Sequence, residues 1–534
     1  MASLLASEAT SAAGGRVIAG DAQARLHGAA IDSRAVRGGE LFFAFAGAHA
    51  DGHRFVGDAF RRGAAGAVVQ DPAAAAPAAG AAPELRGRAV IQVADTLAAL
   101  HDVARVVRRR VPRRLIGITG SAGKTTTKEL LAAMLATRYR VARNPGNFNN
   151  LYGFPLALLN VPDDAEWMVA EMGMSTPGEL RQLSLLGRPD VALFTVVRPA
   201  HLQSFDNLRG IAEAKAELLA GLAPGGLVVA NAGDPEVVRI ALRYLAGGGE
   251  GAAGGESAAG GEGAAGAGGA ESPRRRVVWY GIRSSAPSSS SPASPASPAA
   301  PASPADDLPP LDVVALDLVP GPAGIGSRFV LLAGGRSQPV WLPLHGLYNV
   351  ENCLAAAACA FALGVPPADI AAAAEQARPA AGRGVVHRVV LQGAGAARGE
   401  GAGLTVIDDS YNSNPDALEK ALAGAAQLPA ARRLAVLGDM LELGPESPRF
   451  HRQGGLAAAR LGFDPVAGVG ELARELAAGA REGGAAAAWH RDAAAAAEWA
   501  AAAVRPGDVV LVKGSRGVGL DAVVRRLLAL GEAG

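Results

Sequence analysis

Residues 115–129 read LIGITGSAGKTTTKE, and this stretch decides how the rest of the chain is interpreted. Its apolar beginning predicts a buried strand, the GSAG that follows predicts a tight loop, and TTTKE predicts the start of a helix. In such a joint the N–H groups of the loop and of the first helical turn point at one spot, where the helix dipole favours an anion. Lys124 adds a full positive charge there, and Thr125 or Thr126 offers a hydroxyl for Mg²⁺. We therefore predict a site for the phosphates of a nucleotide.

The loop is shorter than the common nucleotide-binding motif. That motif has a glycine five residues before the glycine that precedes the lysine, and here the position is Ile118. An ordinary strand–turn–helix joint can also contain glycines. It would rarely place GKTTT directly after a strand, so the phosphate-binding interpretation is favoured.

Composition sets broad limits on the protein. A chain of 534 residues exceeds the size at which one core keeps growing, so two to four domains are expected. The 51 basic and 50 acidic residues give no sign of nucleic-acid binding. The sequence shows no signal peptide or membrane-spanning segment, which predicts a cytoplasmic protein without a membrane partner. Cys353 and Cys359 are expected to be small core residues, without a disulfide or thiolate metal site.

Lysine is rare in this chain, which otherwise uses arginine as its cation. The five lysines stand at positions 124, 128, 215, 420 and 513. A lysine provides a compact charge for phosphate or, once deprotonated, a nucleophile, and arginine does not. We expect Lys128 and Lys420 to lie on solvated faces and the other three to have functional roles.

The first 108 residues or so predict a small α/β domain, because short apolar runs alternate with polar turns. We expect strands at 29–34, 40–45 and 65–70, with a helix at 56–62. Asp32, Ser33 and Arg34 end the first of these strands. Two interpretations stay open for them, turn formation and ligand binding.

From residue 115 the alternation of strands and helices predicts a mainly parallel sheet, whose ligands lie beyond the carboxyl ends of the strands. Further strands are expected at 140–142, 167–171, 191–197 and 226–230. The segment 144–150, NPGNFNN, Glu171 and His201 follow three of these strands. Each has an ordinary alternative as a cap or loop residue, but together they suggest ligands for a hard metal. Lys215 lies in a helical pattern, and a surface position between Glu213 and Glu217 is its alternative.

Two tracts of low complexity, 247–271 and 284–304, are predicted to be flexible insertions on either side of a strand at 276–281. Next come a hairpin of 311–318 with 327–333 and a helix at 348–363. A second series begins near residue 382, and its strands are expected at 404–408, 434–437, 465–469 and 508–512. The segments 408–415, 438–444 and 513–516 place polar groups after three of these strands, which predicts a ligand crevice.

In these motifs the chain resembles the Mur ligases, the ATP-dependent amide-forming enzymes of peptidoglycan precursor synthesis. The resemblance runs from residue 31 to 526 without the two tracts. It rests on the sequences TGSAGKTT, GNFNN, EMG, AHL, AKAE, DDSYNSNP, LGDMLELG and VKGSR. Arg198 departs from the pattern, because family members often have a small residue there.

The resemblance implies three α/β domains. These would be an N-terminal domain for the uridine nucleotide at 1–108, a central ATPase-type domain with a mainly parallel sheet at 109–380, and a Rossmann-like domain at 381–534. It also implies a monomer and small-molecule substrates, UDP-N-acetylmuramoyl-tripeptide and D-alanyl-D-alanine. The reaction would pass through an acyl phosphate intermediate. A Mur or folylpolyglutamate-type ligase with another amine acceptor, and a non-enzymatic nucleotide-binding module, stay open as alternatives.

Roles for individual residues also come from the resemblance. Catalysis is assigned to Lys124, Glu171, His201 and Lys215. The cofactors would be ATP and two Mg²⁺ ions, with Thr125 and Glu171 on one ion, His201 on the second, and Lys215 carbamylated as a further metal ligand. The nucleotide would be held by Gly120, Ser121, Ala122, Gly123, Lys124, Thr125, Thr126, Asn352, Arg383, Asp409 and Asn412. The substrates would be held by Ser33, Arg34, Asn147, Asn149, Asn150, Tyr411, Asn414 and Lys513.

Overall fold

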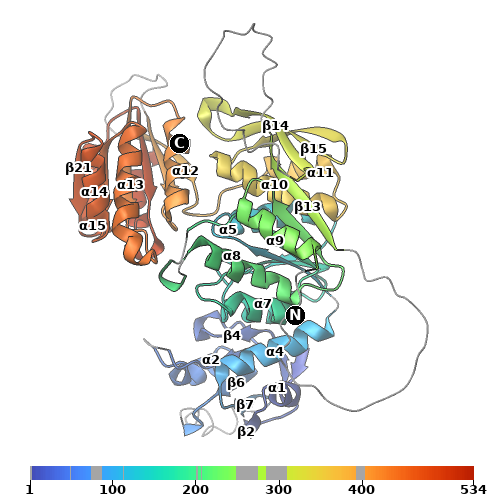
Figure 1. Cartoon of the computed structure of the whole chain (residues 1–534). Coiled ribbons are helices and arrows are strands. Elements are labelled where there is room, and N and C mark those ends of the chain that lie inside the picture. The colour runs from blue at the N-terminus through green and yellow to red at the C-terminus, as the bar shows by residue number, and fades with distance from the viewer. Residues whose placement is uncertain are drawn as a thin grey trace.

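The structure is a computed structural model, and it describes residues 3–47, 50–73, 87–111, 113–199, 202–205, 207–247, 275–283, 309–391 and 403–533. Figure 1 shows three α/β domains, the first in blue, the second in green to yellow and the third in orange to red. The central domain lies between the other two. Apart from Gly247, the two low-complexity tracts lie outside the described residues.

The N-terminal domain contains a five-stranded sheet in the order β2 (Arg16–Gly20), β7 (Ala89–Gln92), β6 (Gly66–Val69), β5 (Leu41–Phe43) and β4 (Ala29–Ala30). A separate pair joins β1 (Ser3–Leu5) to β3 (Arg25–His27). The helices are α1 (Ala6–Ala12), α2 (Val56–Arg61) and α4 (Thr96–Arg110). The strand predicted at 29–34 is too long, because the Asp32 side chain accepts the N–H of Arg34 and starts a 3₁₀ turn, Ser33–Ala35.

The central domain contains a nine-stranded sheet, which is parallel around the strand of the phosphate loop. Its order is β16 (Arg336–Leu342), β15 (Ser327–Ala333), β14 (Val313–Pro320), β13 (Arg276–Ile282), β12 (Leu227–Asn231), β11 (Val191–Phe194), β8 (Arg114–Thr119), β10 (Trp167–Glu171) and β9 (Val141–Arg143). β16 was not predicted. It is an edge strand, RSQPVWL, in which three polar residues and Pro339 precede the apolar end, and this weakens the strand signal.

Helices cover both faces of the central sheet. On one face are α5 (Lys124–Ala136), α10 (Leu347–Ala362) and α11 (Pro367–Glu375), which pack around Ile116 and Ile118. The other face carries α6 (Gly153–Leu159), α7 (Glu179–Gly187), α8 (Leu208–Ala216) and α9 (Pro235–Leu245). On this second face the buried side chains of the central domain form one continuous cluster with Leu100 and Val103 of α4, so the N-terminal domain shares a core with it. Cys353 and Cys359 are buried in α10, as predicted.

The C-terminal domain contains a seven-stranded sheet in the order β21 (Ala487–His490), β20 (Phe463–Val469), β19 (Arg432–Gly438), β22 (Asp508–Lys513), β18 (Gly403–Asp409), β17 (Val385–Leu391) and β23 (Gly531–Ala533). Its helices are α12 (Pro415–Ala426), α13 (Ser447–Arg460), α14 (Ala473–Glu482), α15 (Ala493–Ala503) and α16 (Asp521–Leu528). Alternate residues of β19 enter two different cores, Leu434 and Val436 one of them and Ala435 and Leu437 the other. The three strands with polar ends, β18, β22 and β19, are neighbours, as the predicted crevice requires.

None of the helices in the described ranges has the length and apolar character needed to cross a bilayer.

Candidate active site

A cavity of about 590 Å³ lies between the central and C-terminal domains. It brings together most of the residues that the sequence predicted for the site. These are Ser121, Ala122, Gly123, Lys124, Thr125, Thr126, Asn147, Asn149, Asn150, Glu171, Lys215, Asn352, Arg383, Asp409, Tyr411, Asn412, Asn414 and Lys513. Ser33, Arg34 and Gly120 are not among the residues that line it, and His201 lies outside the described residues. Ser33 is buried in the N-terminal domain, and Arg34 pairs with Asp32 at its surface.

The phosphate loop is held by close contacts from two sides. Gly123 has a φ of +84° at the start of α5, and an added Cβ would lie 2.0 Å from Oδ1 of Asn352. A Cβ on Gly120 would lie 1.8 Å from Oγ1 of Thr195. Both positions therefore require glycine, and Asn352 of α10 is packed directly on the loop.

Lys124 lies at the first position of α5 and bends back over the loop. Its Nζ donates a hydrogen bond to the carbonyl of Gly120 at 2.8 Å. Burial lowers the pKa of Lys124, the carboxylate of Glu171 opposes that effect, and the nearby charge of Arg383 lowers the pKa further. The loop thus places the charge of Lys124 near that of Arg383, and two neighbouring cations suit the binding of an anion.

Glu171 ends β10 and is only 3% exposed. Its carboxylate accepts hydrogen bonds from Oγ1 of Thr125 and from Nδ2 of Asn149, each at 2.7 Å. Asn144 fixes the backbone of Glu171, donating to its carbonyl and accepting its N–H. A hydroxyl and a carboxylate therefore meet next to the phosphate loop, and such oxygens suit Mg²⁺.

Lys128 corrects one prediction from the sequence. It was expected on a solvated face, but it is fully buried. Its Nζ donates to the carbonyl of Asn144 at 2.8 Å and to that of Gly146 at 3.2 Å. Lys128 thereby ties α5 to the asparagine loop that carries Asn149.

The surface alternative for Lys215 is wrong, because this residue of α8 is 3% exposed and lines the cavity. The glutamates on either side bind elsewhere: Glu213 pairs with Arg239 and Arg243, and Glu217 accepts the N–H of Gly178. Burial lowers the pKa of Lys215 well below its usual value, and the charge of Lys124 lowers it further. Both effects shift the protonation equilibrium of Lys215 toward the neutral amine.

The C-terminal domain contributes the opposite wall of the cavity. Lys513 is buried and donates to Oδ2 of Asp409 at 2.7 Å and to the carbonyl of Asn412 at 2.9 Å, which fixes the loop after β18. The guanidinium carbons of Arg383 and Arg516 lie 4.2 Å and 5.3 Å from the ring centre of Tyr411.

Other polar residues of this domain serve the fold itself. Asn414 caps α12 by accepting the N–H of Ala417, and Oδ1 of Asp439 accepts the N–H of Ala473 at the start of α14.

Sequence reasoning missed some of the cavity residues. Lys420 was expected on a solvated face, but it lines the cavity and its Nζ lies 3.4 Å from both Glu351 of α10 and Asp416 of its own helix. The spacing of Asp416 and Lys420 indicates a helical ion pair, but nothing in the sequence joins them to Glu351. Within the described part of the chain, no group of three or more His, Cys, Asp or Glu side chains is arranged to hold a metal ion.

The fold and the site define a ligase class with three α/β domains: the chain belongs to the Mur ligase family. Three descriptions of that family match it, "Mur ligase family, catalytic domain" at residues 25–108, "Mur ligase middle domain" at 118–244 and "Mur ligase, glutamate ligase domain" at 396–516. The predicted family, fold class and ligase class are therefore confirmed, and the alternative of a non-enzymatic module is not favoured.

Among its relatives are ligases with one particular substrate pair in their names. The UDP-N-acetylmuramoyl-tripeptide–D-alanyl-D-alanine ligase of Bacillus subtilis is 30% identical over 516 residues, covering 95% of this chain and 94% of that protein. The enzyme of the same name from Mycobacterium tuberculosis H37Rv is 33% identical over 534 residues, covering 93% and 91%. The crystal structure of MurF from Acinetobacter baumannii superposes with a TM-score of 0.75 at 26% identity and covers 99% of both chains.

Proposed function

We propose that this chain catalyses the ATP-dependent addition of D-alanyl-D-alanine to UDP-N-acetylmuramoyl-tripeptide in peptidoglycan precursor synthesis. The proposal rests on one observation above all: the phosphate loop, the Thr125–Glu171 pair and the buried Lys215 meet the strand ends of the C-terminal domain in a single cavity. The names of the Bacillus and Mycobacterium relatives support the choice of substrates.

The chemistry follows from this arrangement. The terminal carboxylate of the tripeptide attacks the γ-phosphoryl group of ATP, which forms an acyl phosphate and releases ADP. The amine of the dipeptide then attacks the acyl carbon, the C–N bond forms, the amine loses a proton and phosphate leaves. Lys124 and the loop N–H groups stabilise negative charge on the phosphoryl group during its transfer. The C-terminal domain over the cavity keeps water from the acyl phosphate.

The residues present fit Mg²⁺. Thr125 and Glu171 would hold one ion through a hydroxyl and a carboxylate oxygen, and the bound ion would supply positive charge to the phosphates. We propose that the neutral amine of Lys215 adds to CO₂ and loses a proton, which converts the amine into an anionic carbamate ligand. His201, which lies outside the described residues, would be a ligand of a second ion.

The remaining assignments are extended from the family. Gly120 to Thr126, Asn352, Arg383, Asp409 and Asn412 would bind ATP, and Asn147, Asn149, Asn150, Tyr411, Asn414 and Lys513 would lie near the substrates. Ser33 and Arg34 would contact the uridine-linked substrate from the N-terminal domain. We also propose domain bounds of 1–108, 109–380 and 381–534, a monomer and a cytoplasmic location.

An amine screen tests the choice of acceptor. ADP release is measured with ATP, Mg²⁺ and UDP-N-acetylmuramoyl-tripeptide, while D-alanyl-D-alanine, single amino acids and glutamate are supplied in turn. The proposal predicts the highest kcat/KM for the dipeptide. A preference for a single amino acid would leave the ligase class intact and overturn the substrate assignment. If glutamate is inactive, the folylpolyglutamate-type alternative is overturned as well.

A further inference from the structure

The segment that follows β11 holds the phosphate loop through its backbone. The N–H of Ser121 donates to the carbonyl of Val196 at 2.7 Å. The hydroxyl of Ser121 donates to the carbonyl of Arg198 at 2.8 Å and accepts the N–H of Arg198 at 3.0 Å. The backbone of Arg198 is therefore hydrogen-bonded directly to the phosphate loop.

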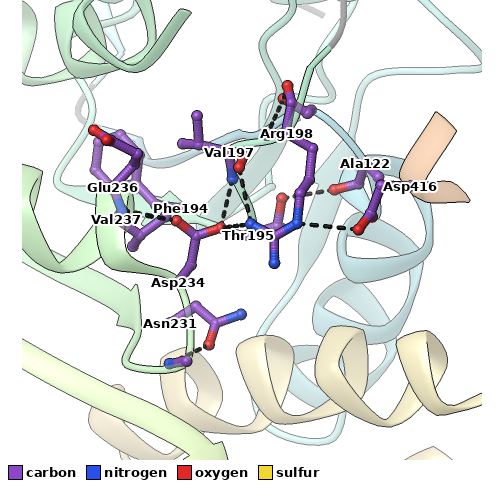
Figure 2. Close-up of polar contacts among 12 residues, drawn as sticks. Ala122, Phe194, Thr195, Val197, Arg198, Asn231, Asp234, Glu236, Val237 and Asp416 are labelled. Carbon is purple, nitrogen blue, oxygen red and sulfur yellow. Dashed lines mark hydrogen bonds and ion pairs between the residues drawn. The ribbon is translucent and has the colours of Figure 1, made fainter. Parts of the chain in front are cut away.

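The side chain of Arg198 joins two carboxylates from different domains (Figure 2). Its guanidinium forms an ion pair with Asp234, which is fully buried, and its Nε donates to Oδ1 of Asp416 at 3.1 Å. Asp234 also caps α9, since its Oδ1 accepts the N–H groups of Glu236 and Val237. Asp416 lies in the first turn of α12, in the C-terminal domain.

Partial burial and a backbone hydrogen bond hold Arg198 in the position from which it reaches Asp416. Its side chain is 27% exposed and that of Asp416 21% exposed, so the pair is screened less than an ion pair on an open surface. Asp234 further accepts the N–H of Val197 at 2.9 Å, which fixes the backbone from which the arginine extends. The ion pair therefore extends from a fixed backbone in the central domain to Asp416 in the C-terminal domain.

Among the described residues, further polar links between the same domains include Lys420 with Glu351 and the N–H of Gln203 with the carbonyl of Glu442. The Arg198 link differs from both because its own backbone binds Ser121 of the phosphate loop.

We propose that Arg198 is a positioning residue that fixes the C-terminal domain against the phosphate loop in the orientation seen here. It couples the two through Ser121 on one side and Asp416 on the other. The activity readout of this inference rests on the proposed ligase function. The shape of the protein in solution provides a second readout, which is independent of the proposed ligase function.

The variants Arg198→Gln, Asp416→Asn and their combination separate this role from a purely structural one. Asp416→Asn removes the negative charge of the link between domains, together with that of the Asp416–Lys420 pair, and leaves the ion pair of Arg198 with Asp234 in place. Arg452→Gln is the matched control. Arg452 also pairs with two carboxylates, those of Glu475 and Glu482, but within the C-terminal domain.

The first readout is the radius of gyration of the full chain in small-angle X-ray scattering without substrates. Asp416→Asn and Arg198→Gln should both enlarge it, and Arg452→Gln should not. The second readout is steady-state kinetics. Loss of the preferred orientation lowers the fraction of competent enzyme, so KM for the amine should rise about 3- to 10-fold while kcat at saturation changes less.

The double variant should match the more severe single variant, because both substitutions remove the same link. Three results would overturn the proposal. The first is an unchanged radius of gyration in Asp416→Asn, and the second is fully additive effects in the double variant. The third is an Arg198→Gln variant that has a lower melting temperature but an unchanged radius of gyration and an unchanged KM for the amine. If no substrate pair supports ADP release in the wild type, the proposed function fails and the scattering result alone decides the role of Arg198.

Discussion

The ammonium group of Lys128 donates a hydrogen bond to the backbone carbonyl of Asn144 at 2.8 Å, in a position without solvent exposure. Asn144 in turn binds the backbone of Glu171 through both ends of its side-chain amide. The helix of the phosphate loop, the asparagine loop and the carboxylate proposed for Mg²⁺ are thus connected by one chain of hydrogen bonds.

Replacement of Lys128 by Met should destabilise the protein, because the carbonyls of Asn144 and Gly146 lose their donor inside the core. Each buried group left without a partner costs about 1–3 kcal/mol of unfolding free energy. Urea denaturation would measure the change. Lys420→Met is the comparison, and its partly exposed ion pairs should contribute less than about 1 kcal/mol. Equal stability of the two variants would show that the buried hydrogen bonds of Lys128 contribute no more to the free energy of unfolding than the ion pairs of Lys420.

Replacement of Lys124 by Ala should abolish turnover and preserve the fold. The variant loses the charge that faces the transferring phosphoryl group, and the loss of one such electrostatic contact reduces kcat by about 10²-fold or more. Steady-state ADP release would be measured together with circular dichroism. A folded variant with near-normal kcat would show that Lys124 does not act on the phosphate.

Replacement of Lys215 by Ala should also inactivate the enzyme, and small carboxylates such as acetate or formate should partly restore turnover by occupying the carbamate position. Lys215→Arg should stay inactive, since a guanidinium does not take up CO₂ under these conditions. An arginine variant as active as the wild type would contradict the carbamate assignment.

The pH dependence of the carbamate follows from the direction of the pKa shift of Lys215. Only the neutral amine reacts with CO₂, and burial lowers the pKa of Lys215 well below its usual value. The carbamate should therefore form at pH values below the usual titration range of lysine, and it should be lost as the pH falls through that lowered pKa. A ¹³C NMR titration with ¹³CO₂ would follow the signal. A signal that is absent near neutral pH and present only above about pH 10, the usual range for lysine, would contradict the effect of burial.

The two cysteines should be inert in the folded protein. Burial raises the pKa of Cys353 to about 12 and raises that of Cys359 as well, so neither forms a thiolate near pH 8. Ellman's reagent should detect no thiol in the native protein and both thiols in guanidinium chloride. Rapid reaction of either cysteine in the native state would show that α10 is accessible to the reagent.

The sequence predicted the elements whose signal is local. The phosphate loop was recognisable because a strand, a glycine turn and a helix follow one another within fifteen residues. The C-terminal crevice was recognisable because polar segments stand directly after apolar strands, and β18, β22 and β19 do lie side by side.

Contacts between distant segments could not be predicted in this way. The burial of Lys128 depends on a carbonyl sixteen positions away, and α5 is apolar on so many sides that its periodicity does not reveal a buried lysine. The partners of Arg198 lie 36 and 218 positions further along the chain. Only the folded structure brings such pairs together.

The central claim is that this chain joins a dipeptide to a nucleotide-linked peptide at the expense of ATP, and product analysis tests it most directly. The purified protein is incubated with ATP, Mg²⁺, UDP-N-acetylmuramoyl-tripeptide and D-alanyl-D-alanine, each component is omitted in turn, and the nucleotide product is analysed by mass spectrometry. We expect ADP and phosphate only in the complete mixture, with the mass of the nucleotide-peptide increased by one dipeptide less one water. ADP release that no acceptor stimulates, with the nucleotide-peptide unchanged in mass, would contradict the account.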